Sequence, residues 1–116
     1  MSVTMNIQTQ TNADFSLALR YLAGSEPVDL TGSVLRMMVR HAPPAVGAMI
    51  SIDSAALGGI DIEDAANGLF NILLPRDALS RMTAGSYAYD IVRARPDGLI
   101  EPVLAGAITH TVGVTR

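Results

Sequence analysis

The clearest strand signal in the sequence is the stretch Gly85-Ser86-Tyr87-Ala88-Tyr89-Asp90-Ile91-Val92, in which large apolar side chains alternate with small or polar ones. A period of two residues places Tyr87, Tyr89 and Ile91 on one face. This pattern predicts a β-strand with that face turned toward a core.

The residues before this strand, 75–84, are predicted to form a short helical corner between two strands, because at most two helical turns fit there. A corner, a glycine and then Tyr87 has the form of a tyrosine corner, in which the hydroxyl bonds back to upstream backbone in Ig-type sandwiches. The alternative is a plain strand with two aromatic residues on one face.

The same alternation recurs along most of the chain and predicts an all-β protein. Turn signals separate the strands, among them Ala23-Gly24-Ser25-Glu26-Pro27 and Arg95-Pro96-Asp97-Gly98. About seven or eight short antiparallel strands with this spacing predict an Ig-like β-sandwich, and a small β-barrel is the alternative. No repeat or linker divides the sequence, so residues 1–116 are predicted to form a single domain.

Ten residues are predicted to face the core because they alternate in register with polar neighbours. They are Phe15, Leu17, Leu19, Leu35, Met37, Val39, Phe70, Ile72, Tyr89 and Ile91. Replacing one of them by alanine, for example Leu19, is expected to cost about 2–5 kcal/mol.

Composition excludes several classes of function. The 116 residues are 49% hydrophobic and 16% charged, which argues against disorder, and the net charge of −3 makes nucleic acid an unexpected partner. Without cysteine, the chain has no disulfide, thiolate metal site or thiol nucleophile. Neither a signal peptide nor a run of about 18 apolar residues is present, so no membrane association is expected.

No catalytic, cofactor-binding or metal-binding residue is predicted. Four acidic residues lie near one another in the sequence: Asp53, Asp61, Glu63 and Asp64. Their spacing fits no calcium loop and indicates a solvated acidic turn. His41 and His110 stand alone, which favours packing or surface roles over catalysis. Gly58-Gly59 lacks the strand and helix of a phosphate-binding loop.

Several short motifs follow one another along the chain in an order that resembles a known family. They are Asp14-Phe15-Ser16-Leu17-Ala18-Leu19, Pro27-Val28-Asp29-Leu30-Thr31-Gly32, Arg36-Met37-Met38-Val39-Arg40, Gly68-Leu69-Phe70-Asn71-Ile72 and Gly85-Ser86-Tyr87-Ala88-Tyr89-Asp90-Ile91. The series resembles small structural proteins of tailed phages and prophages, and is similar to the Ig-like N-terminal domain of phage baseplate upper proteins.

This resemblance implies a structural protein of a virion, in the tail, baseplate, fibre attachment or head surface, assembled in the bacterial host cytoplasm. It implies no catalytic residues and no cofactor, and other virion proteins as partners. The alternative function is a carbohydrate-binding or adhesion module of a host-recognition apparatus. Glycan binding that disappears when Tyr21 or Tyr87 is changed would favour this alternative. Aromatic residues make up only 4% of the chain, which counts against sugar binding.

Oligomerisation is predicted from the sheet edges. The first strand (4–10) and the last strand (104–114) are lightly charged, and the chain contains no lysine to protect an exposed edge. Such edges are tolerated where another subunit covers them, so a homo-oligomer is expected.

Overall fold

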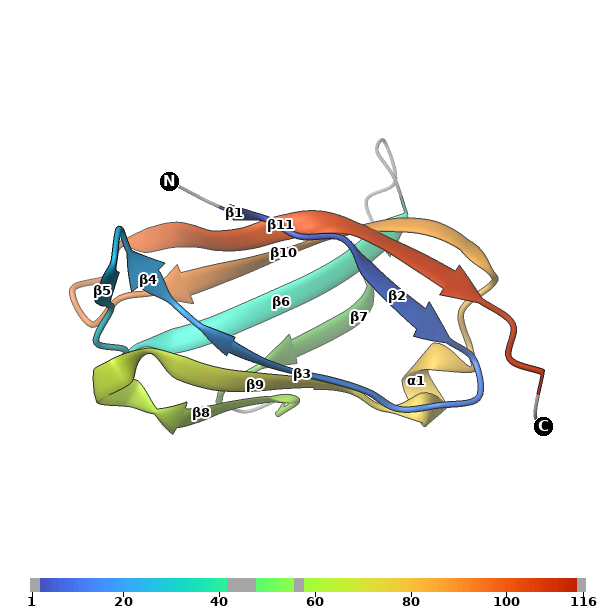
Figure 1. Cartoon of the computed structure of the whole chain (residues 1–116), viewed down its shortest axis with the longest axis horizontal. Coiled ribbons are helices and arrows are strands. Elements are labelled where there is room, and N and C mark those ends of the chain that lie inside the picture. Colours follow the sequence, from blue (N-terminus) through green and yellow to red (C-terminus); the bar gives the residue numbers. More distant parts are fainter. Residues whose placement is uncertain (1–2, 42–47, 56–57, 115–116) are drawn as a thin grey trace.

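The computed structural model describes residues 3–41, 48–55 and 58–114 and consists of two β-sheets packed face to face (Figure 1). The larger sheet has the strand order β1-β11-β10-β6-β7, and β2 also pairs with β11. The smaller sheet has the order β3-β9-β8, and β4 and β5 form a separate hairpin. The elements are β1 (Val3–Thr4), β2 (Ile7–Gln10), β3 (Phe15–Arg20), β4 (Leu22–Ala23), β5 (Glu26–Pro27), β6 (Val34–His41), β7 (Ala48–Asp53), β8 (Ile60–Asp64), η1 (Ala65–Asn67), β9 (Leu69–Leu74), α1 (Arg76–Leu79), β10 (Gly85–Ala94) and β11 (Ile100–Thr111).

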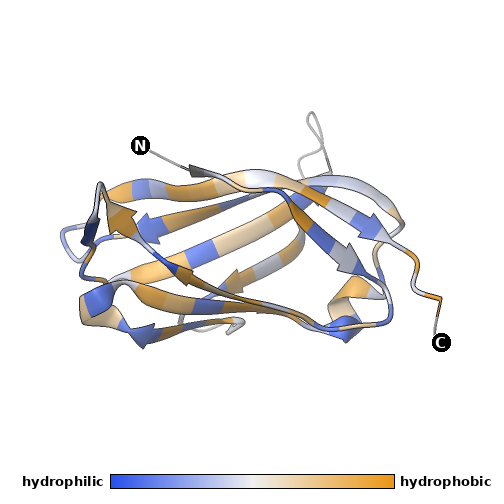
Figure 2. Ribbon diagram, viewed as in Figure 1, coloured by the Kyte–Doolittle hydropathy of each residue, from blue (hydrophilic) through white to orange (hydrophobic). Residues whose placement is uncertain are grey.

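Two separate layers confirm the predicted Ig-like β-sandwich, and the barrel alternative is not formed. Within β10, side chains alternate between buried and more exposed along the strand, as the period of two requires. The alternating bands of hydrophobic and hydrophilic residues along the strands in Figure 2 show the same pattern. Two details differ from the prediction: β10 and β11 are long, with 10 and 12 residues, and β1 and β2 pair with β11 in parallel.

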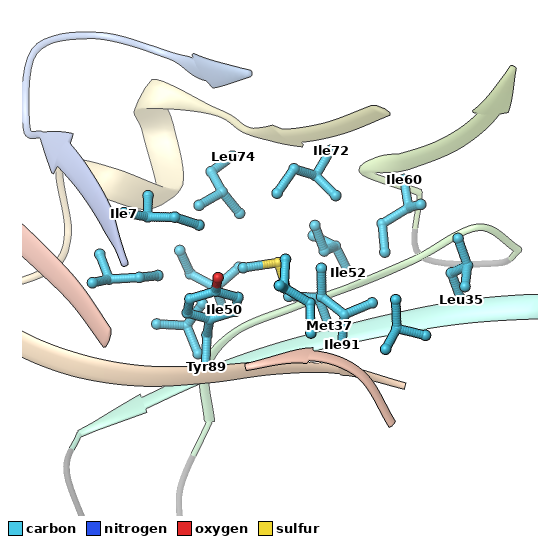
Figure 3. Close-up of a cluster of buried hydrophobic side chains, with 14 of the residues drawn as sticks. Ile7, Leu35, Met37, Ile50, Ile52, Ile60, Ile72, Leu74, Tyr89 and Ile91 are labelled. Atoms are coloured by element: carbon cyan, nitrogen blue, oxygen red, sulfur yellow. The ribbon is translucent and has the colours of Figure 1, made fainter. Parts of the chain in front are cut away.

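The core lies between the two sheets and draws on both of them. Figure 3 shows Ile72 and Leu74 of the smaller sheet facing Met37, Tyr89 and Ile91 of the larger one. Nineteen buried hydrophobic residues make up this cluster in the described part of the chain. Burying a single such side chain contributes about 1.5–3 kcal/mol, so this cluster is the main stabilising feature of the fold.

Seven of the ten predicted core residues are buried: Leu35, Met37, Val39, Phe70, Ile72, Tyr89 and Ile91. The three on β3, namely Phe15, Leu17 and Leu19, pack against the core but are only half-buried. Alternation predicted their direction correctly, but their burial was overestimated. Strand β3 is an edge strand of the smaller sheet, so a neighbour covers it on one side only.

The predicted helical corner at 75–84 contains one turn of helix. Helix α1 begins after Pro75, whose carbonyl accepts a hydrogen bond from Leu79 N at 3.1 Å. Proline is favourable at a helix start because its missing N–H needs no partner there. Leu79 and Met82 are both buried, so the corner closes one end of the core.

The last strand is not an edge, contrary to the prediction. β11 lies between β10 on one side and β1 and β2 on the other. β1 and β2 lie alongside β11 at the border of the larger sheet, and the chain crosses to the smaller sheet after Gln10. Gly106 allows this close approach, because a Cβ there would lie 1.9 Å from the Met5 carbonyl oxygen.

Candidate interaction surface

A polar cluster joins the two sheets at one end of the sandwich. Arg93 continues the inward-facing series of β10, and its Nη1 lies 2.7 Å from Glu101 Oε1. Its Nε donates to Ser33 Oγ at 2.9 Å and its Nη2 donates to the Asp29 carbonyl at 3.0 Å. An arginine on a core-facing position therefore has a partner for each of its three nitrogens. We call Arg93, Glu101, Ser33, Asp29 and Tyr21 the polar clamp.

Tyr21 brings the segment that follows β3 into the clamp. Its hydroxyl donates to Glu101 Oε1 at 3.3 Å. Burial raises the pKa of the Tyr21 phenol, and the nearby negative charge of Glu101 raises it further. The phenol therefore stays protonated at neutral pH and remains a donor.

The loop that carries Asp29 is held by its own carboxylate. Asp29 Oδ1 accepts hydrogen bonds from Thr31 Oγ1 at 2.6 Å and from Thr31 N at 2.9 Å. These two bonds lower the pKa of the Asp29 carboxyl, the side-chain bond first. This short turn leaves the Asp29 carbonyl free to accept from Arg93.

An apolar groove opens beside the clamp, between the β1–β11 border of the larger sheet and the end of β3. Its volume is about 800 Å³. Phe70, Val103 and Leu104 form its floor and are buried, whereas Met5 and Leu22 on its rim are 37% and 43% exposed. The remaining lining residues are Thr4, Leu19, Arg20, Tyr21, Ala23 and Gly24. We call this site the groove.

The backbone of β3 is unpaired on the side away from β9. Tyr21 N donates to the Gly68 carbonyl at 2.8 Å, in the register that also pairs Leu19 with Phe70. Bonded and non-bonded pairs alternate along an antiparallel ladder, so Phe15, Leu17 and Leu19 bond to β9. The N–H and C=O groups of the alternate residues Ser16, Ala18 and Arg20 therefore point away from β9. No residue in the described ranges hydrogen-bonds to them.

The tyrosine corner is confirmed. Tyr87 is buried, and its hydroxyl donates to the Thr83 carbonyl at 2.5 Å. The Tyr89 hydroxyl donates to the Met5 carbonyl at 2.6 Å, which ties β10 to the chain between β1 and β2. Tyr87 is buried, so its ring offers no exposed face for stacking on a sugar.

His110 packs against this corner. It is buried at 1% exposure, and its ring meets Tyr87 edge-on at 6.3 Å between centroids. His110 Nδ1 lies 2.7 Å from Thr9 Oγ1, so the ring links β11 to β2. The side chain of His41 lies outside the described residues.

The acidic residues lie on an edge strand rather than in a turn. Asp61, Glu63 and Asp64 belong to β8; Glu63 Oε2 accepts from Asn71 Nδ2 at 3.1 Å. Asp53 is buried on β7, where its Oδ1 accepts from Ala55 N at 2.9 Å. In the described ranges no three histidine or acidic side chains are arranged to hold a metal ion. No helix in this part of the chain is long and apolar enough to cross a membrane.

Sequence reasoning missed the clamp and the groove. A signal for the clamp exists, because Arg93 follows Tyr87, Tyr89 and Ile91 at the same period, and a charge on a core face requires buried partners. The groove has no such signal. Its existence depends on which strands fail to pair, and alternation describes only which way each side chain points.

Comparison with solved structures supports the fold. The N-terminal domain of phage TP901-1 ORF48 matches with a TM-score of 0.50 and 11% identity, over 95% of this chain and 94% of that domain. Murine CRIg matches at a TM-score of 0.44 and 15% identity, over 93% of this chain and 92% of the other. At 11% identity the phage likeness concerns the fold alone. No protein-family model and no curated protein matches the sequence.

Proposed function

We propose that this protein is a non-enzymatic structural and assembly protein of a tailed-phage virion or phage-like particle. The observation that carries the proposal is the match to a phage protein domain over nearly the full length of both chains. The match covers 95% of this chain and 94% of that domain. Its place in the tail, baseplate, fibre attachment or head surface is part of the same proposal.

The surface is consistent with a protein that contacts other chains. The groove exposes apolar side chains beside an unpaired sheet edge, and apolar surface of this kind is typical of interaction sites. We propose that its partners are other virion structural proteins, including copies of itself. Two side chains of types that often serve in catalysis have structural roles here. Asp53 orders a loop through its bond from Ala55 N, and His110 links β11 to β2 through Thr9.

The test is to locate the protein in particles. Phage production is induced in the strain that encodes the chain, and particles are purified by density gradient and analysed by quantitative mass spectrometry and immunogold electron microscopy. The expected result is a fixed copy number per particle with label at one site, and defective particles when the gene is deleted. A matched host cytoplasmic protein serves as the contamination control. The proposal would be refuted if this chain were absent from purified particles and particles remained normal after its gene was deleted.

A further inference from the structure

We propose that the free edge of β3 and the groove beside it form a strand-addition site, which binds an extended segment of another protein chain. The segment is about six residues long, matching the six residues of β3 at about 3.3 Å each. Its side chains alternate, with apolar residues toward the groove and polar residues outward. One of the outward residues is acidic and lies opposite Arg20.

The backbone supplies the first argument. Ser16, Ala18 and Arg20 direct three N–H and three C=O groups to one side of β3, at the spacing of a β-ladder. An apolar small molecule cannot pair with these groups, whereas an added strand does. The ladder between β3 and β9 is regular over all six residues, so no bulge interrupts the edge at which a partner strand would pair.

Edge protection supplies the second argument. β8, at the other border of the smaller sheet, carries Asp61, Glu63 and Asp64 and has a register shift between Ile62 and Asp64. Charges and irregular pairing are devices that prevent edge-to-edge association. β3 has no proline or bulge, and its single charge is Arg20 at its end, so this edge is much less protected than the edge formed by β8.

The groove supplies the third argument. Leu19, which faces the core, is only half-buried, and it lines the groove together with the exposed rim residues Met5 and Leu22. A strand added to β3 places every second side chain on the same face as Leu19. The apolar side chain beside Leu19 covers the apolar rim, and the others lie beside half-buried Phe15 and Leu17. Each buried methylene contributes about 0.8 kcal/mol.

Charge supplies the fourth argument. Arg20 lies on the rim, is exposed, and forms no ion pair with any residue in the described part of the chain. Directly opposed residues of paired strands lie about 4.5–5.5 Å apart between their Cβ atoms, within reach of an arginine and a carboxylate. An acidic residue on the outward face of the added strand therefore complements this site.

The test uses a blocked synthetic peptide of about seven residues that alternates threonine with valine and carries one aspartate on the threonine face. Binding to the isolated full chain is followed by nuclear magnetic resonance and amide hydrogen exchange. We expect exchange at Ser16, Ala18 and Arg20 to slow at least about tenfold, and a peptide of the same composition with contiguous valines to bind at least about tenfold more weakly.

Two variants isolate the backbone and the charge. Ala18→Pro removes an outward N–H without touching the ladder to β9, and we expect it to weaken binding at least about tenfold, whereas Ala18→Ser keeps the N–H and binds normally. Arg20→Glu should weaken the aspartate peptide and favour its lysine counterpart, and this test remains valid where Ala18→Pro fails to fold.

Equal binding to Ala18→Pro and Ala18→Ser, or protection of amides elsewhere than on β3, would overturn the proposal. So would binding of an apolar dye in the groove without any peptide binding, which would make it a small-molecule site. The inference rests on the proposed assembly role only for the identity of the natural partner. The peptide assay uses isolated protein, so its failure leaves the particle experiment unaffected.

Discussion

Two regions of the sandwich differ in how fully the core is covered: the region around β2, and the region between β1 and β3. On one side, which we call the closed side, β2 covers β11, and Ile7, Thr9, Ile108 and His110 are all buried. The corner around α1 seals the same end through Leu79, Met82 and Tyr87. On the other side, which we call the open side, β1 and β3 do not pair, and the groove lies between them.

The difference shows that facing inward and being buried are separate properties. Ile7 and Leu19 both alternate with polar neighbours, yet Ile7 is 5% exposed and Leu19 is half-buried. Both residues lie on strands that pair on one side only, β2 with β11 and β3 with β9. Leu19 lines the open groove, whereas Ile7 does not. Apolar contact needs a covering element as well as the correct direction.

The largest expected effect compares Leu79 with Leu19. Leu79→Ala should lower the free energy of unfolding by about 2–5 kcal/mol, because it leaves a cavity in a closed part of the core. Leu19→Ala should cost less than about 1.5 kcal/mol, because its side chain already contacts water and the groove remains open. The value expected from the sequence, about 2–5 kcal/mol, is therefore revised downward. Urea unfolding of both variants measures this, and equal losses would contradict the comparison.

The second prediction concerns the point where the two sides meet. Gly106→Ala should cost about 1–3 kcal/mol, because the new Cβ would lie 1.9 Å from the Met5 carbonyl oxygen. The hydrogen bond from Met5 N to the Ala105 carbonyl, at 2.8 Å, should open first. Hydrogen exchange at Met5 checks this local effect.

Ala107→Ser, at the exposed neighbouring position, is the control and should change stability by less than about 0.5 kcal/mol. If Gly106→Ala is as mild as this control, then the N-terminal strand does not depend on the close approach at Gly106.

The sequence predicted the parts of the fold that rest on local rules. Alternation located β10, the Pro75 and Gly85 signals bracketed the corner, and the spacing to Tyr87 indicated its hydrogen bond. Parallel pairing of the first strand with β11 was missed, because pairing partners are chosen by tertiary packing and leave no trace in a period of two.

The same local sequence rules could not predict the candidate site, because it too depends on which strands pair. The groove is defined by an absent neighbour for β3, and the strand sequence reads the same with or without one. The acidic residues of β8 were recognised as solvated, but their position on an edge strand depends on sheet order. In the clamp, only Arg93 can be recognised from the sequence, because it follows Tyr87, Tyr89 and Ile91 at the same period of two residues.

The third prediction compares two tyrosine hydroxyls. Tyr87→Phe should cost about 0.5–1.5 kcal/mol, because the phenol is buried and its loss leaves the Thr83 carbonyl without this bond. Tyr21→Phe should cost less than about 0.5 kcal/mol, because Glu101 keeps its ion pair with Arg93 and remains partly hydrated. Thermal and urea unfolding give both values. A greater loss for Tyr21→Phe would place the stronger anchor on the open side.

The smallest expected effect is the loss of stability at alkaline pH. It distinguishes a phenol pKa raised by burial alone from one that a nearby charge also raises. Burial alone raises the pKa of Tyr89 above its usual 10.0, whereas for Tyr21 the charge of Glu101 adds to burial. A raised pKa means that the folded state holds the phenol proton more tightly than the unfolded state. The resulting stabilisation is fully present below about pH 10 and is lost as the pH rises through the folded pKa.

The free energy of unfolding should therefore fall from pH 9 to pH 11, values on either side of the usual phenol pKa of about 10. Tyr89→Phe and Tyr21→Phe should each remove part of this fall. Salt distinguishes the two parts, because added salt screens the repulsion between Glu101 and an ionised Tyr21 at the groove rim but leaves the cost of ionising buried Tyr89 unchanged. The part of the alkaline loss that Tyr21→Phe removes should shrink at high salt, and the part that Tyr89→Phe removes should not. The opposite salt dependence would mean that Tyr21 is the more enclosed phenol, and that the side of the sandwich beside β3 is closed in solution.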